Sequence, residues 1–403
     1  MKKIILKSSL LALLFFQSSL IAGESERELV LGNQRDLFLE LVNQGMGIAS
    51  ATEILLTSCS PCNLETEAVI AALLSDWDNF KKGSTEKDLK GALDSLNARI
   101  EFGKVSSFYS LLLAKKWNLN SVFNEAQMDH IITQQNQLAC FYKEELELEK
   151  RLSDCEKNSI SETINNESNL RELLNRAPSE ADSIVDRTRL YMVCRHDRSH
   201  PCMKVLRDVN GQWVENEDGS IWSQGSLGYS RKKKPFYKTD GDTPSGVYKL
   251  NGVMPSANRT TAFGKFRRII MDFIWTTNRT NKFLPQSQIS KDWWNQANIA
   301  RDAGRNLFRI HGTGMKNRRT RSNYYPFVGQ RGCVSTREGT YDGVKFVDQR
   351  KLLDKMMEAQ GLDPIYANET KIRSIFYVIN INDNNTAVTK DEVLSYIEVA
   401  SEQ

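Results

Sequence analysis

The chain has 403 residues, of which 26% are charged, and its formal net charge is +4. This length predicts more than one domain, because domains usually contain about 100 to 200 residues. Beyond the first residues no unbroken apolar run reaches about 18 residues, and the basic run 231–234 is short, so the sequence argues against a stable membrane anchor and against a nucleic-acid partner.

Residues 1–23 have the pattern of a secretory signal peptide. Lys2, Lys3 and Lys7 give it a positive start, the apolar run 10–21 is too short to cross a bilayer, and Ala22 or Gly23 offers a small residue for cleavage. We therefore expect an exported protein, and we predict a periplasmic location.

Residues 24–178 are predicted to form an acidic helical domain. Residues 24–180 contain 16 Lys and Arg against 26 Asp and Glu, and their apolar residues recur near helical spacing. Residues 181–403 reverse this balance, with 35 basic against 24 acidic residues. The segment 179–185, at the crossover, is interpreted as a linker.

The second half is typical of strands. Short alternating or β-rich runs at 189–193, 203–206, 308–310 and 375–381 predict strands, and a helix is expected at about 347–360. The predicted fold class is therefore α+β and multidomain, with a helical N-terminal domain followed by a mainly β domain over 186–383. Residues 254–306, rich in Phe and Trp, are interpreted as an insertion or lid, with core packing as the alternative, and residues 384–403 as a helical tail.

Six of the seven cysteines can pair, and export favours disulfides: Cys59, Cys62, Cys140, Cys155, Cys194 and Cys202. Cys194 and Cys202 give the easiest local closure. The alternative, a metal site that adds His196 and His200, has a non-standard spacing, so we expect no metal and no cofactor. Cys59 and Cys62 also fit a redox pair, and a thiol–disulfide oxidoreductase therefore stays open.

The remaining cysteine, Cys333, lies in a pattern that suggests a nucleophile. It follows Gly332, and the string that begins with His311 and Gly312 precedes it by about 20 residues. A thiol needs a base to attack a carbonyl, which an imidazole supplies, and a glycine lets the backbone turn its amides toward an oxyanion. The alternative is a buried, inert thiol and a histidine at a strand end.

Three ordered motifs resemble the catalytic domain of L,D-transpeptidases of the YkuD type, which act on bacterial peptidoglycan: Thr243-Pro-Ser-Gly246 before a strand, Ile310-His-Gly-Thr313 and Gly332-Cys-Val334. The resemblance covers about residues 186–383. Where the family often has an arginine two residues after the cysteine, this chain has Ser335. The N-terminal half resembles no family that we can name.

The resemblance implies a cysteine-dependent acyltransferase. Cys333 and His311 would be the catalytic pair, the carbonyl of Gly312 would orient the imidazole, and amides around Gly332 would hold the oxyanion. Peptidoglycan stem peptides are the expected partner, and the residues expected to bind them are Arg331, Thr313, Ser335, Tyr325 and Trp275.

The acceptor is left open by the sequence. An amine acceptor gives transpeptidation, whereas water gives an L,D-carboxypeptidase that trims tetrapeptide stems to tripeptides. A catalytically inactive wall-binding protein is the third reading. The N-terminal domain is expected to position the protein on the wall, to bind a protein partner or to cover the cleft.

Overall fold

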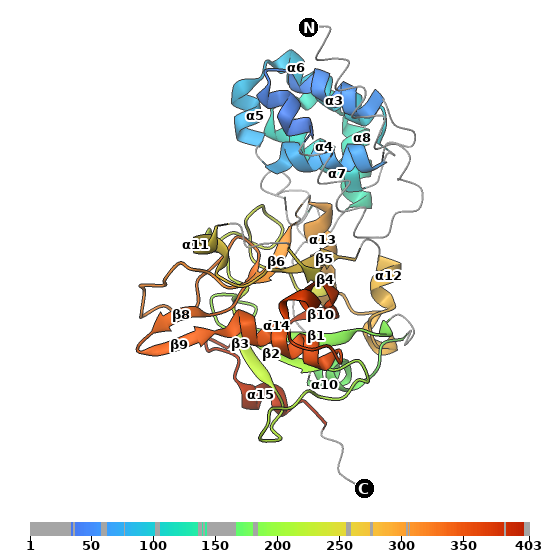
Figure 1. The fold of residues 1–403 in the computed structure, drawn as a ribbon. Helices are drawn as coiled ribbons and strands as arrows, with labels where there is room; N and C mark the ends of the chain where they lie inside the picture. The colour runs from blue at the N-terminus through green and yellow to red at the C-terminus, as the bar shows by residue number, and fades with distance from the viewer. Residues whose placement is uncertain are drawn as a thin grey trace. The chain divides into compact units, whose positions relative to one another are not determined.

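The computed structural model describes residues 34, 37–57, 63–75, 77–100, 105–135, 139, 142, 167–179, 184–254, 259–274, 277–303, 305, 307–382 and 384–398. The chain divides into two compact units, residues 1–136 and 137–403 (Figure 1). The expected signal peptide and Cys59, Cys62, Cys140 and Cys155 lie outside the described residues. None of the described helices is both long enough and apolar enough to cross a membrane.

The N-terminal unit is helical in its described part, as the apolar spacing predicts. Its helices are α3 (Ile48–Thr57), α4 (Asn63–Ser75), α5 (Trp77–Gly83), α6 (Glu86–Asn97), α7 (Val105–Lys116), the 3-10 turn η1 (Asn120–Val122) and α8 (Glu125–Gln134). Leucines and aromatic residues at helical spacing form its core, for example Leu93 and Phe108, both fully buried.

Helices α3 and α6 are joined by a carboxylate at a helix start. Asp88 accepts hydrogen bonds from the amides of Ile48 (2.9 Å) and Ala49 (3.0 Å), which have no partner within their own helix. A Cβ on Gly47 would lie 2.7 Å from the same carboxylate, so glycine permits this approach.

The C-terminal unit is built on an eight-stranded mixed sheet with the order β3-β2-β1-β10-β4-β5-β6-β7. The strands are β1 (Thr188–Cys194), β2 (Cys202–Arg207), β3 (Ser223–Ser226), β4 (Gly246–Val253), β5 (Ile269–Phe273), β6 (Phe308–His311), β7 (Val334–Ser335) and β10 (Arg373–Asn380). A separate hairpin joins β8 (Glu338–Tyr341) and β9 (Val344–Val347). The coarse prediction, helices first and a mostly β part after them, is confirmed.

The helical elements of this unit are α10 (Glu167–Asn175), α11 (Thr260–Phe263), α12 (Thr277–Asn281), η3 (Gln286–Gln288), η4 (Trp293–Asn295), α13 (Gln296–Asp302), α14 (Asp348–Ala359), η5 (Tyr366–Lys371) and α15 (Lys390–Leu394). The helix expected at about 347–360 corresponds to α14. The helical tail is represented by α15 within 384–398.

Two segments differ from the expected boundaries because of where their apolar side chains pack. Leu170, Leu173 and Leu174 of α10 belong to the core of the C-terminal unit, so this helix lies with the sheet although it precedes the expected linker 179–185. The segment 254–306 supplies β5, a strand inside the sheet, and Trp293 and Trp294 are buried in the same core. These two tryptophans therefore pack in the core and do not form a lid.

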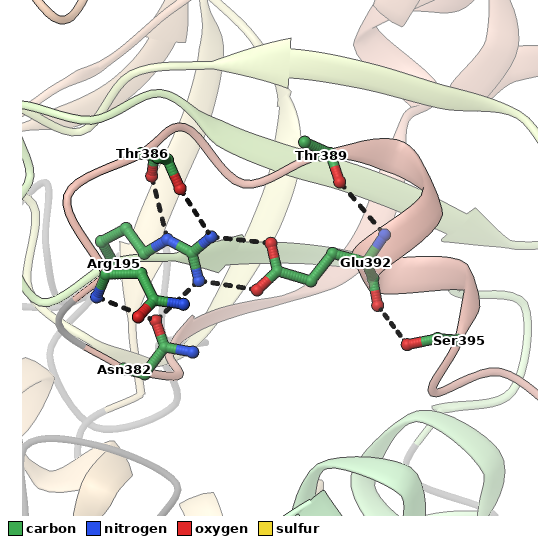
Figure 2. Close-up of polar contacts among 7 residues, drawn as sticks. Arg195, Asn382, Thr386, Thr389, Glu392 and Ser395 are labelled. Carbon is green, nitrogen blue, oxygen red and sulfur yellow. Dashed lines mark hydrogen bonds and ion pairs between the residues drawn. The ribbon is translucent and has the colours of Figure 1, made fainter.

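A buried arginine anchors the C-terminal tail to the end of β1. Arg195 forms two 2.7 Å contacts with the carboxylate of Glu392 and donates to the carbonyl of Thr386 (2.9 Å) and to Asn382 (2.7 Å), as Figure 2 shows. Next to it, the predicted disulfide between Cys194 and Cys202 is formed. The sulfurs of this pair are therefore not available as metal ligands.

Candidate active site

The sheet register brings the sequence segments of His311 and Cys333 together. Strands β6 and β7 are parallel neighbours in which Ile310 pairs with Val334 and His311 with Ser335. Continued back by one residue, this register places Cys333 beside Arg309. Because side chains alternate with a period of two and paired residues share a face, Arg309, His311, Cys333 and Ser335 lie on one face of the sheet.

The thiol of Cys333 lies against the backbone of β6. Its sulfur is 3.9 Å from the carbonyl oxygen of Leu307, and the backbone amide of Arg309 donates a hydrogen bond to it. Burial raises the pKa of the Cys333 thiol, and the Arg309 amide and the charges of Arg309, Arg305 and Arg268 act against that rise. Cys333 is a free cysteine and is half-buried.

His311 is held in one tautomer. Its Nδ1 lies 2.5 Å from the carbonyl oxygen of Gly312, and since a carbonyl only accepts, Nδ1 carries the proton and Nε2 is left as an acceptor. Burial lowers the pKa of His311 to about 4, and the charges of Arg268 and Arg309 act in the same direction. The imidazole is therefore neutral at physiological pH and able to take a proton at Nε2.

The loop before the thiol turns at Gly332, where φ is +104°, a conformation that L residues rarely adopt. A Cβ at this position would lie 2.2 Å from Nη2 of Arg305. Arg305 is itself buried and donates to the carbonyls of Phe236, Gly241 and Asp242, while Thr243 Oγ1 donates to the carbonyl of Gly332 (2.8 Å). The backbone just before Cys333 is therefore held in place by Thr243 and Arg305, and Arg305 is itself bound to the loop 236–243.

The turn leaves three consecutive amides without a partner. Among the described residues, the N–H groups of Arg331, Gly332 and Cys333 donate to no acceptor, whereas the nearby amides of Gln330 and Ser335 donate to the carbonyls of Tyr229 and Leu227. Amides that have no partner inside the protein are suited to bind an oxyanion beside the thiol.

A glutamine behind the pair ties its two strands together. Gln349 of α14 is fully buried and donates to the carbonyls of Ile310 (3.1 Å) and Arg267 (2.9 Å), and Thr336 donates to its Oε1 (3.1 Å). One side chain thus joins β6, through Ile310, to the residues Arg267 before β5 and Thr336 after β7.

Two of the predicted substrate-binding residues, Thr313 and Ser335, have buried side chains. Thr313 is buried, donates to the carbonyl of Thr261 (3.2 Å) and accepts from the amide of Met315 (3.1 Å). Ser335 is fully buried beside His311, and within the described residues its hydroxyl has no hydrogen-bond partner. Both side chains are thus enclosed.

Of the remaining predicted residues, Arg331 and Tyr325 lie in the loop between β6 and β7. Arg331 is 53% exposed and its Nη1 is 3.6 Å from the carboxylate of Asp240. Tyr325 packs edge-on against Tyr341, with ring centroids 5.8 Å apart. Trp275 lies outside the described residues.

Sequence reasoning missed the cations around the pair. Arg268 lies just before β5, where Ile269 pairs with Ile310, so one step further along the antiparallel register it lies beside His311. Its guanidinium stacks 4.2 Å over the ring of Phe263, and that ring contacts His311 edge-on at 5.1 Å. The signal that points to Arg309 is its position two residues before His311 on a strand, which places both on one face.

A buried carboxylate was also missed. Glu338 of β8 accepts a hydrogen bond from the amide of Lys265 (2.6 Å), and its other oxygen, Oε2, lies against the backbone of Gly312 and Gly264. Burial raises the pKa of Glu338. No sequence pattern distinguishes this residue from an ordinary surface glutamate.

Comparison with known proteins gives no further indication: no family model, no curated protein and no solved structure matches the chain.

Proposed function

We propose that the protein is a peptidoglycan L,D-transpeptidase that uses Cys333 as its nucleophile. The observation that carries the proposal is the register of β6 and β7, which sets Cys333 and His311 on one face of adjacent strands, with Nδ1 of the imidazole bound to Gly312 and Nε2 left to accept a proton. The order of the three motifs, which resembles this family, supplies the substrate class.

In the proposed reaction Nε2 of His311 takes the proton of the Cys333 thiol as the sulfur attacks the carbonyl at the L-centre of the third residue of a donor stem. Since burial keeps the imidazole neutral and raises the pKa of the thiol, the proton moves during the attack and no thiolate–imidazolium pair stands ready beforehand.

The tetrahedral oxyanion would then be held by the unpartnered amides of residues 331–333, a contribution of about 3 kcal/mol per donor in comparable enzymes. The C–N bond breaks, the amine of the terminal D-alanine takes the proton from His311, and a thioester to Cys333 remains. An incoming amine returns a proton to His311, attacks the thioester and releases the thiol.

Water in place of the amine gives the second candidate, an L,D-carboxypeptidase. The same pair and the same amides serve both outcomes. The two activities differ in which acceptor reaches the thioester.

The test is mass spectrometry of purified tetrapeptide-stem muropeptides incubated with the mature protein, with Cys333→Ala and with His311→Gln. Loss of D-alanine together with new dimers supports transpeptidation, and loss of D-alanine to tripeptides alone supports the carboxypeptidase. Activity that persists in Cys333→Ala overturns the role of the thiol. If folded wild-type protein binds muropeptides without changing them, the wall-binding reading replaces both.

A further inference from the structure

Two arginines lie near the thiol of Cys333. One is on β6, the strand that carries His311, and the other comes just before β5, the strand on the opposite side of β6 from Cys333. Arg309 lies on β6 beside Cys333, and Arg268, just before β5, lies on the other side of His311. The alternation of side chains puts both on the face that carries the catalytic pair.

The arginines near the thiol differ in their hydrogen-bond partners. Arg305 is buried and committed to three backbone carbonyls. Arg309 is half-buried, and its Nη1 donates to the carbonyl of the preceding Phe308. No carboxylate among the described residues forms an ion pair with Arg309, in contrast to Arg331, which faces Asp240.

The surroundings of Arg268 give it a fixed orientation. Its guanidinium lies over the ring of Phe263, which in turn contacts the imidazole of His311. The guanidinium of Arg268 therefore places a positive charge near the thiol, and this charge acts to lower the pKa of Cys333.

We propose that Arg309 and Arg268 form a carboxylate subsite beside Cys333, which selects acyl donors with a free carboxylate next to the scissile bond. Arg331, one of the residues that the sequence suggested for substrate binding, is solvent-facing and lies 3.6 Å from the carboxylate of Asp240. The identification of the donor as a stem peptide depends on the proposed function, whereas the preference for an anion at the thiol does not.

The subsite is tested by alkylation of Cys333 in the full mature chain with iodoacetate, which is anionic, and with iodoacetamide, which is neutral. Peptide mapping by mass spectrometry reads the rate at Cys333 alone. Because both reagents attack the same thiolate, the ratio of the two rates cancels any change in the thiolate fraction and reports the preference for an anion.

We expect the ratio of iodoacetate to iodoacetamide rates to fall about 5- to 10-fold in Arg309→Gln and in Arg268→Gln, the size expected when one charge near the thiol is lost. Arg309→Lys, which keeps the charge, should retain most of the ratio. The matched control, Arg176→Gln, removes an exposed arginine at the end of α10 and should leave the ratio within about twofold of wild type.

The salt dependence of the ratio in the wild type tests the subsite without any variant, so it does not depend on whether the variants fold. Its ratio should decrease as salt rises from about 20 to 500 mM, because screening weakens the attraction of the anionic reagent. A ratio that is insensitive to salt and unchanged in Arg309→Gln and Arg268→Gln overturns the subsite. A ratio that falls in Arg331→Gln but not in the other two variants assigns the role to Arg331 instead.

If the muropeptide assay shows turnover, two modified donors identify which carboxylate of the stem binds to the subsite. Donors amidated at the third-residue side chain and donors amidated at the terminal D-alanine are compared with the unmodified stem. The carboxylate bound by the subsite is the one whose amidation removes the difference in KM between wild type and Arg309→Gln. Anion preference in alkylation without turnover of any muropeptide would uphold the subsite and reject the proposed function.

Discussion

The carboxyl group of Glu338 lies directly against the Cα atom of Gly312. A Cβ built on Gly312 would come within 2.0 Å of Glu338 Oε2, and a Cβ on Gly264 would meet the same oxygen at the same distance. Any larger residue at the position that orients His311 through its carbonyl would therefore require Glu338 to move, because this side chain from β8 occupies the space of a Cβ at Gly312.

Gly312→Ala is expected to destabilise the C-terminal unit by about 1–3 kcal/mol, the usual cost of an extra methyl group in a packed site. Glu338 would have to move and give up its hydrogen bond from Lys265. Urea unfolding measures the change. The same substitution should cost less in a Glu338→Ala background, and an equal cost in both backgrounds would show that Glu338 is not the obstacle.

The alkylation rate of Cys333 should keep rising with pH beyond pH 9. Burial raises the pKa of its thiol above the ordinary value of 9.0, so the thiolate fraction at neutral pH is small. Iodoacetamide labelling between pH 6 and 10.5, followed by mass spectrometry of the Cys333 peptide, gives the profile. A plateau reached below pH 7 would indicate a preformed thiolate–imidazolium pair and would contradict the neutral pair described here.

His311 should make the folded state lose stability as the pH falls. Its folded pKa of about 4 lies below the unfolded value of 6.5, so the unfolded chain binds more protons between these values. The stabilisation is complete above pH 6.5 and is lost as the pH decreases to 4, by about 3 kcal/mol in total.

Unfolding free energies of wild type and His311→Gln at pH 7 and pH 4.5 test this. Asp242, whose pKa burial raises to about 6, acts with the opposite sign in both proteins, so the difference between them isolates the histidine. Identical pH dependence in the two proteins would argue against a depressed pKa of His311.

The sequence predicted the central strands of the sheet, because they are short runs rich in β-forming residues. Residues 189–193 and 375–381 are β-rich runs buried on both faces, and they became the central parallel pair β1 and β10. The helix over 348–359 followed from its amphipathic spacing. Cys333 and His311 were identified as candidates because each has a glycine beside it in an ordered motif.

The sequence did not indicate whether the apolar face of a helix packs against other helices or against the sheet. The leucines of α10 show an amphipathic helix, yet nothing in their spacing tells whether the partner is another helix or the sheet. The interpretation of the aromatic-rich segment 254–306 as a lid failed for the same reason, since Phe273 is part of β5 and Trp293 is buried in the core of the C-terminal unit. The roles of Glu338 and Gln349 depend on contacts between residues far apart in the chain, which a pattern of residues cannot show.

Gln349→Met is expected to destabilise the C-terminal unit by about 2–4 kcal/mol. It keeps the side-chain volume but removes the donor to the carbonyls of Ile310 and Arg267 and the acceptor of the Thr336 hydroxyl. The matched control is Gln360→Met just after the same helix, where a hydrogen bond from the amide of Arg373 and a long, exposed one to the carbonyl of Asp186 are lost, at about 0.5–1.5 kcal/mol. Equal costs in thermal or urea unfolding would mean that Gln349 does not tie the strands together.

The buried pair of Arg195 and Glu392 should respond very differently to single and double substitution. Glu392→Met leaves the charge of Arg195, which is 2% exposed, without its partner, and we expect a loss of about 3–5 kcal/mol. Arg195→Met with Glu392→Met removes both charges and should cost clearly less, because no uncompensated charge remains buried.

Unfolding measured by urea titration at pH 7 separates the two cases. The control is Glu358→Met, which breaks the more exposed pair with Lys355 and should change stability by less than about 1 kcal/mol. If the double variant loses as much stability as Glu392→Met, the cost comes from lost packing of the tail residues 384–398 and not from the unpaired charge. If Glu392→Met is as mild as the control, the tail is not anchored through Arg195.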